Sequence, residues 1–237
     1  MVMSNERHSR SPHRSPVYVV DDHPLVRESL RSLIDQQSDL QVCGDSADAP
    51  VALAAIKELK PDVAIVDLSL KTGSGLELIK DLKTHCPQVA VIVLSMHDEN
   101  LYAERALRAG ARGYVMKRET TKNILTAIRR VLGGAVYVSE AFAGTMAERI
   151  SGKRPLSVGP LSPAEELSDR ELEVFRSLGH GVGTAQTAVN LNLSLNTVQV
   201  YCARIKAKLS LANANELLRE AVRFVERTSG PDKAVEE

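Results

Sequence analysis

Five short apolar runs dominate the first half of the chain, and each is followed by a longer segment with helical periodicity. The runs are VYVV (17–20), LQVCG (40–44), VAIV (63–66), VAVIVL (89–94) and GYVM (113–116). Runs this rich in β-branched residues are typical of parallel strands that helices cover on both faces. Five strands alternating with five helices over about 120 residues predict an α/β, doubly wound domain with a five-stranded parallel sheet.

Helical stripes between these runs support the same fold. Leu76, Ile79 and Leu82 recur at the three-residue spacing that places side chains on one helix face. Gly110 follows another helical pattern, AERALRA, and is expected to end that helix in a left-handed conformation. We expect the whole α/β domain to span residues 16–135.

The second half of the chain lacks such runs and consists of short amphipathic helices. Residues 136–164 are interpreted as a linker helix capped by Ser139 and followed by a flexible stretch rich in Pro, Gly and Ser. Four helices are predicted over 165–226, with a tight turn between the second and third, which is typical of a small all-α helix-turn-helix domain. Ser168 and Glu171 have the spacing of a capping box at its start.

Composition excludes several classes of protein. The 30 basic and 30 acidic residues leave no net charge, which excludes a uniformly basic nucleic-acid coat. Aromatic residues make up only 3%, so stacking on nucleic-acid bases is disfavoured. No apolar run approaches the ~18–20 residues of a membrane span. We expect residues 1–15 to be a polar, disordered leader and not a signal peptide, and residues 227–237 to be a polar tail. Cys43, Cys86 and Cys202 are widely spaced, so we expect reduced thiols, a cytoplasmic location and no membrane partner.

Charged and polar side chains come at the ends of four of the predicted strands. These are Asp21, Asp22, Asp67, Ser95 and Lys117. Because doubly wound sheets bind ligands at the carboxyl ends of their strands, we expect these groups to converge. Clustered carboxylates repel one another unless a cation is present, and their hard oxygens suit Mg²⁺. Each residue alone would be a turn former or a solvated charge, so the prediction depends on their occurring together.

A carboxylate in such a cluster can also act as a nucleophile and accept a phosphoryl group. Lys117 would then neutralise charge on the phosphoryl group, and Ser95 would donate a hydrogen bond to one of its oxygens. The residues thus point to magnesium-dependent phosphoryl transfer to an aspartate.

Four segments resemble the signature segments of a bacterial response-regulator receiver domain of the NarL/FixJ family. They are YVVDDHPLVRESL, VDLSLKTGSGLELI, VIVLSMHDE and ARGYVMKRE, in the family's order and spacing. The resemblance implies that Asp67 is the phosphoacceptor. It also implies a Mg²⁺ site in which Asp22 and Asp67 are ligands, Asp21 acts largely through water, and the Ser69 backbone carbonyl completes the protein ligands.

The resemblance also implies a switch that responds to the phosphoryl group. Ser95 and Lys117 would contact the phosphoryl oxygens, and Tyr114 matches the switch aromatic, although a half-buried strand tyrosine explains its position equally well. Lys71 stands where many family members have proline, which affects the expected loop conformation and not the chemistry. His23, beside the acidic pair, is interpreted as structural and not as a metal ligand.

The segment 165–226 resembles a LuxR-type helix-turn-helix in LSDRELEVFRSLGHG, SLNTVQVYCARIKAKL and ANELL. In its third helix Val198, Cys202, Ile205 and Leu209 share one face, which we expect to be buried. The opposite face would read DNA through adenine-pairing amides, a phosphate contact near the helix N-terminus and basic side chains. The candidate DNA-binding residues are Asn196, Thr197, Gln199, Arg204, Lys206 and Lys208.

The charge of this module is positive but modest. No acidic residue lies between Glu173 and Glu216, whereas Arg176, Arg204, Lys206 and Lys208 supply four positive charges. The family often has basic residues at positions where this chain has Ala185, Gln199 and Ala203. Fewer cations predict weaker non-specific DNA binding and a shallower dependence on salt.

Together these features predict a phosphorylation-dependent, DNA-binding transcriptional regulator of a two-component signalling system, and not an enzyme in its own right. Its expected partners are a sensor histidine kinase, double-stranded DNA and, when phosphorylated, a second copy of itself. One alternative is a signalling adaptor or phosphate sink whose C-terminal module contacts protein instead of DNA. Another is a hydrolase acting through Asp67, which is disfavoured because Ser69 stands where a general acid would be needed.

Overall fold

The computed structural model describes most of the chain, and it divides the chain into two compact units, Met1–Ala147 and Glu148–Glu237. The described residues are 14–70, 74–118, 121–151, 163–191 and 193–228. Lys71, most of the expected leader and tail, and the Pro-rich part of the expected linker lie outside them. Each unit is described by itself.

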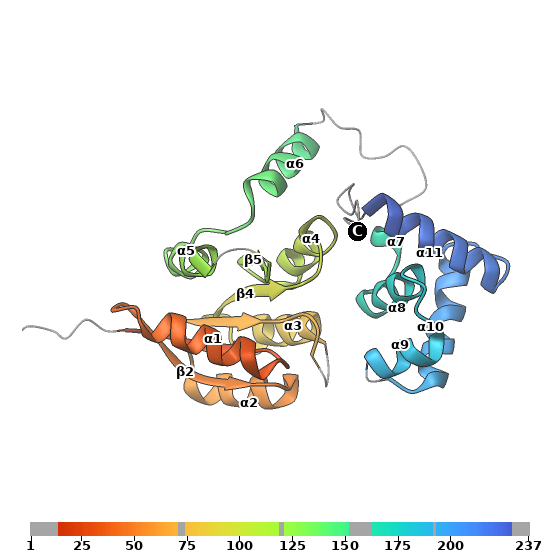
Figure 1. The fold of residues 1–237 in the computed structure, drawn as a ribbon. Helices are drawn as coiled ribbons and strands as arrows, with labels where there is room; N and C mark the ends of the chain where they lie inside the picture. The colour runs from red at the N-terminus through yellow and green to blue at the C-terminus, as the bar shows by residue number, and fades with distance from the viewer. Residues whose placement is uncertain (1–13, 71–73, 119–120, 152–162, 192, 229–237) are drawn as a thin grey trace, which may run out of the picture. The chain divides into compact units, whose positions relative to one another are not determined.

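A five-stranded parallel sheet forms the centre of the first unit (Figure 1). Its strands are β1 (Ser15–Val20), β2 (Leu40–Ser46), β3 (Val63–Val66), β4 (Ala90–Ser95) and β5 (Gly113–Met116). They pair in the order β2-β1-β3-β4-β5, and every pair is parallel. The predicted doubly wound sheet is confirmed.

Five helices connect and cover these strands. They are α1 (Pro24–Asp35), α2 (Ala49–Leu59), α3 (Gly75–His85), α4 (Glu99–Ala109) and α5 (Thr121–Leu132). Ile34 of α1 and Ile128 of α5 are buried with Val17, Ile65 and Ile92 in one core, so α1 and α5 share a face of the sheet. The strand order reverses after β2, which places the right-handed crossovers α2, α3 and α4 on the other face.

Gly110 and Gly75 occupy positions where a side chain would not fit. Gly110 ends α4 with a φ of 128°, which confirms the positive-φ helix end expected from the sequence. Gly75 begins α3, and its backbone N–H donates to the Leu68 carbonyl over 3.1 Å. A Cβ on Gly75 would lie 2.1 Å from the Asp67 carbonyl oxygen, so glycine allows α3 to start directly against the backbone that carries Asp67.

The chain beyond α5 stays attached to the sheet edge. Tyr137 forms a parallel bridge with Gly113 of β5, and its carbonyl accepts from the Tyr114 N–H over 2.8 Å. Ser139 then starts α6 (Glu140–Ile150), since its hydroxyl accepts from the Phe142 N–H over 3.1 Å. The expected Ser139 cap is confirmed.

The secondary structure in the described part of the second unit is helical. Its helices are α7 (Pro163–Glu166), α8 (Asp169–Gly179), α9 (Thr184–Asn190), α10 (Leu195–Lys208) and α11 (Ala214–Thr228). The predicted capping box is present, because Ser168 and Glu171 each accept a hydrogen bond from the other's backbone N–H. The helix-turn-helix is formed by α9 and α10. No helix in the described ranges is long and apolar enough to cross a membrane.

The core of this unit corrects one detail of the sequence prediction. Val198 and Ile205 of α10 are fully buried, as expected, but Cys202 and Leu209 are only half-buried. The core of this unit also contains Phe175 of α8 and Phe224 of α11, whose ring centroids lie 5.6 Å apart. α11 also continues to Thr228, two residues into the expected polar tail.

Substituting Gly75 with alanine should destabilise the first unit. The added methyl would overlap the backbone of Asp67 and Leu68, and overpacking of this kind costs about 1–3 kcal/mol. The matched control is Gly144→Ala in α6, where no atom lies within 4 Å of the new Cβ and alanine is the better helix former. Urea unfolding of both variants checks the prediction, and a Gly75→Ala protein as stable as Gly144→Ala would contradict it.

Candidate functional site

Acidic side chains converge at the carboxyl ends of β1 and β3. Asp21 follows β1 and Asp67 follows β3, and their exposed fractions are only 1% and 3%. Asp22 and His23 lie beside them, and one ligand atom from each of the four residues lies within 4.8 Å of the others. The structure therefore brings together the three carboxylates that the sequence placed at one edge of the sheet.

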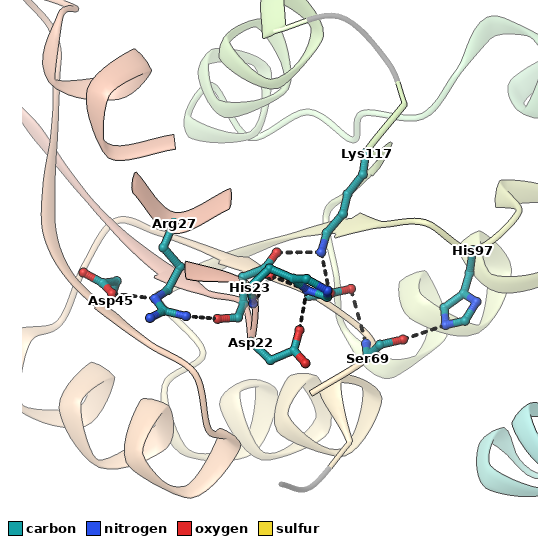
Figure 2. Close-up of polar contacts among 9 residues, drawn as sticks. Asp22, His23, Arg27, Asp45, Ser69, His97 and Lys117 are labelled. Atoms are coloured by element: carbon teal, nitrogen blue, oxygen red, sulfur yellow. Dashed lines mark hydrogen bonds and ion pairs between the residues drawn. The ribbon is translucent and has the colours of Figure 1, made fainter. Parts of the chain in front are cut away.

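Lys117 bridges the two buried carboxylates (Figure 2). Its Nζ lies 2.6 Å from Asp67 Oδ2 and 2.7 Å from Asp21 Oδ2. Burial raises the pKa of the Asp67 carboxyl, and the ion pair with Lys117 only partly offsets this. Burial opposes the charge of Lys117 too, but the carboxylates, Asp67 foremost, raise the pKa of the ammonium overall. Because two carboxylates share one ammonium, the cluster also carries excess negative charge.

Local backbone contacts orient the acidic side chains. The His23 N–H donates to Asp21 Oδ1 over 2.9 Å, and the Ser69 N–H donates to Asp67 Oδ1 over 3.2 Å. His23 Nδ1 lies 2.6 Å from Asp22 Oδ1, and the His23 side chain is 65% exposed. The imidazole therefore sits over the outer carboxylate, at the solvent side of the cluster.

The donor set fits a hard divalent cation. Carboxylate oxygens within 4.8 Å of one another, at a position partly open to solvent, are the ligands that Mg²⁺ takes while keeping several waters. The residues that could hold it are Asp21, Asp22 and Asp67, with the Ser69 carbonyl on the loop that follows β3.

Ser95 and Tyr114 are connected through His97, which sequence reasoning missed. Ser95 is fully buried at the end of β4, and its hydroxyl accepts from the His97 N–H over 3.2 Å. The Tyr114 hydroxyl donates to the His97 carbonyl over 2.9 Å. Burial raises the pKa of the Tyr114 phenol, and the ring is 1% exposed, so Tyr114 is fully buried and not half-buried.

The His97 side chain reaches a second part of the site. Its Nε2 lies 2.9 Å from Ser69 Oγ (Figure 2). Its ring stacks on Tyr102 with the ring centroids 4.6 Å apart. His97 thereby connects the loop after β4 with the loop after β3. Its place in the segment VIVLSMHDE was visible in the sequence, but these contacts depend on two loops meeting in space.

The recognition-helix candidates lie on α10. Ser194 caps this helix, because its hydroxyl accepts from the Thr197 N–H over 3.0 Å. Asn196, Gln199 and Arg204 are exposed, whereas Thr197 and Lys206 are half-buried. The Thr197 hydroxyl lies 2.8 Å from the Ser194 hydroxyl, so it already has one hydrogen-bond partner within the chain.

Lys208 has a structural partner that the sequence did not indicate. Its Nζ lies 2.6 Å from Oε2 of Glu171, a carboxylate that is 3% exposed. Burial opposes the charge of Glu171, but the Lys208 ammonium and the Ser168 N–H outweigh it and lower the pKa of the carboxyl overall. Lys208 thus joins the C-terminal turn of α10 to the capping box of α8.

The two units together define a class of protein, the bacterial response regulator. The family model described as response regulator receiver domain matches residues 17–129, and the model described as bacterial regulatory proteins, luxR family, matches residues 165–221. The chain belongs to the LuxR family of response regulators. It therefore combines a receiver domain with a LuxR-type DNA-binding domain, as the sequence predicted.

Individual relatives support this membership. The oxygen regulatory protein NreC of Staphylococcus aureus is 32% identical over 209 residues, which are 87% of this chain and 96% of NreC. RcsB from Salmonella enterica serovar Typhimurium, solved on the promoter rprA with the phosphomimetic BeF3−, is 25% identical. Its TM-score is 0.59 over 89% of this chain and 99% of RcsB. A LuxR-family response regulator from Aurantimonas is 31% identical, with a TM-score of 0.55 over 58% of this chain and 99% of its own.

Asp67→Asn should stabilise the metal-free protein at neutral pH. A carboxyl whose pKa is raised in the folded state loses its stabilising contribution as pH rises, so ionised Asp67 costs stability at pH 7. We therefore expect the variant to unfold at a higher Tm than the wild type at pH 7. Thermal unfolding in a chelator between pH 4 and 8 measures this. The gain should shrink toward the ordinary carboxyl pKa of 3.8, and a gain independent of pH would contradict the account.

Lys208→Met should loosen the second unit, because it leaves the buried Glu171 carboxylate without its ion-pair partner. Losing a charged partner of this kind costs about 1–3 kcal/mol. Lys206→Met, two residues away on the same helix, is the matched control. Hydrogen exchange of α8 and α10 amides in the full chain should accelerate in the first variant and not in the second. Equal exchange in both variants would show that the Lys208–Glu171 pair contributes nothing.

Proposed function

We propose that this protein is a transcriptional regulator switched by phosphorylation of Asp67. The observation that carries the proposal is the buried Asp67 carboxylate at one edge of a receiver sheet, where it shares its ion-pair partner Lys117 with Asp21. The receiver would comprise residues 16–135 and the DNA-reading domain residues 165–226. The phosphoryl donor would be a sensor histidine kinase, or a small phosphorylated molecule.

The chemistry follows from the groups at the site. A carboxylate oxygen of Asp67 attacks phosphorus, the bond from phosphorus to the donor breaks, and the donor leaves with that electron pair. Mg²⁺ held by Asp21, Asp22, Asp67 and the Ser69 carbonyl would neutralise charge on the phosphoryl oxygens. Lys117 would exchange its contact with Asp67 Oδ2 for one with a phosphoryl oxygen. The desolvation cost would be small, because the ammonium is already largely removed from solvent in the site.

The switch would begin at Ser95, whose hydroxyl would turn to a phosphoryl oxygen. Its hydrogen bond with the His97 N–H would break, and His97 also holds the Tyr114 hydroxyl. Tyr114 in turn donates its backbone N–H to Tyr137, at the start of the connection to the second unit. A rearrangement of the β4–α4 loop would thus be transmitted to the connecting chain through a series of hydrogen bonds.

Contact with DNA would come from the exposed face of α10. Asn196 and Gln199 would read base edges, while Thr197, Arg204 and Lys206 would contact phosphates. Lys208 would contribute less to phosphate binding than the other basic residues, because its ammonium already forms an ion pair with Glu171. RcsB solved as two dimers on two parallel DNAs supports DNA binding as a homodimer, and this homodimer would form when Asp67 is phosphorylated.

The other interpretations have less support. The adaptor alternative, in which the C-terminal module contacts protein, has no observation in its favour. A regulator of this kind would catalyse only its own phosphorylation and dephosphorylation, so we propose no separate enzymatic activity. The cytoplasmic location expected from the sequence stays a prediction.

The experiment compares Asp67→Asn with Asp81→Asn, an exposed carboxylate on α3. Each full-length protein is incubated with Mg²⁺ and a small phosphodonor, and phosphoprotein is resolved on a phosphate-affinity gel. DNA fragments selected from a random pool then report binding and its salt dependence. We expect phosphorylation and phosphorylation-stimulated DNA binding in the wild type and in Asp81→Asn, and neither in Asp67→Asn. Phosphorylated Asp67→Asn protein, or wild-type protein that binds no DNA in either state, would contradict the proposal.

A further inference from the structure

Arg27 of α1 reaches back to the turn that carries the acidic pair (Figure 2). Its Nη1 donates to the backbone carbonyl of Asp21 over 2.7 Å, and its Nε donates to Asp45 Oδ2 over 2.8 Å. The Arg27 side chain is only 20% exposed. One guanidinium therefore joins the end of β2 to the backbone of Asp21.

The end of β2 holds Asp21 from both sides of its backbone. The Asp21 N–H donates to the Ser46 carbonyl over 3.1 Å, while Arg27, held by Asp45, binds the Asp21 carbonyl. Asp45 and Ser46 are the last two residues of β2. The backbone of Asp21 is thus held at both its N–H and its carbonyl by residues outside the acidic cluster, whereas its carboxylate contacts the His23 N–H and Lys117.

We propose that Arg27 is a positioning residue for the metal site. It would hold the turn after β1 in the conformation in which the Asp21 and Asp22 carboxylates can bind a divalent cation. This inference rests on the proposed function, because it assumes the Mg²⁺ site of the receiver. Arg27 itself touches neither the cation nor the phosphoryl group, and it acts only through the backbone of Asp21.

An arginine is needed here for geometric reasons. The planar guanidinium presents several N–H donors in a fixed fork, so it can bind a carboxylate and a carbonyl at once in a defined orientation. A lysine keeps the positive charge but offers a single flexible ammonium. Arg27→Lys therefore separates geometry from electrostatics: if charge alone mattered, cation binding would not change.

Arg31 provides a matched control on the same helix. Its Nη2 lies 2.5 Å from Asp45 Oδ1, so it pairs with the same carboxylate as Arg27. The contacts described for Arg31 include none with Asp21, and its side chain is 44% exposed. Arg31→Lys alters the same carboxylate pair and leaves the Arg27 contact with Asp21 in place.

The test measures Mn²⁺ binding to the full chain by electron paramagnetic resonance, with Mn²⁺ as the probe for the Mg²⁺ site. Removing an outer-shell partner typically weakens metal binding by about 10-fold or more. We expect a weakening of about that size for Arg27→Lys and less than twofold for Arg31→Lys, with the same Tm in chelator for both. Phosphorylation of Arg27→Lys by a small donor should recover at saturating Mg²⁺.

Several results would overturn the inference. Wild-type affinity in Arg27→Lys, or an equal loss in Arg31→Lys, would show that Arg27 does not position the site. If Arg27→Lys had a lower Tm in chelator, large enough to explain its weaker Mn²⁺ binding, the effect would be one of general stability and not of positioning. If wild-type protein bound no Mn²⁺, both the inference and the proposed metal site would fail. If Mn²⁺ binding were normal in the wild type and in Arg27→Lys, only the role of Arg27 would fail.

Discussion

One buried ammonium shared by two buried carboxylates is the interaction on which the site depends. Lys117 lies 2.6 Å from Asp67 and 2.7 Å from Asp21, and Asp22 adds a third carboxylate nearby. The cluster therefore carries more negative than positive charge in a place where water screens it poorly. A divalent cation would correct this imbalance, and a phosphoryl group on Asp67 would change it again. Because of this excess negative charge, the site can respond to a divalent cation and to a phosphoryl group on Asp67.

The surrounding structure holds these charges in place by neutral or already balanced contacts. Glycine at position 75 lets α3 begin against the Asp67 backbone, and Arg27, balanced by Asp45, binds the Asp21 carbonyl. The second unit also balances a buried charge locally, since Lys208 forms an ion pair with Glu171, the buried glutamate of the capping box. A chain with no net charge can therefore still place local excesses of charge where chemistry and DNA binding need them.

Patterns local in the chain predicted much of this architecture. The apolar runs predicted all five strands and their parallel pairing, and the carboxyl-end rule predicted that Asp21, Asp67 and Lys117 would meet. Contacts between distant loops escaped prediction. No motif in the sequence singled out Arg27, and the partner of Lys208 lies 37 positions away. Side-chain rotamers and the approach of separate elements decide such contacts, and no spacing in the sequence encodes them.

The central claim is that Asp67, and no neighbouring carboxylate, receives the phosphoryl group. Reduction of an acyl phosphate with borohydride converts that one aspartate into a residue of different mass, which peptide mass spectrometry can locate. After incubation with Mg²⁺ and a phosphodonor, the account predicts the mark at Asp67 and at no other carboxylate. A mark at Asp21 or Asp22, or phosphoprotein that carries no reducible acyl phosphate, would contradict it.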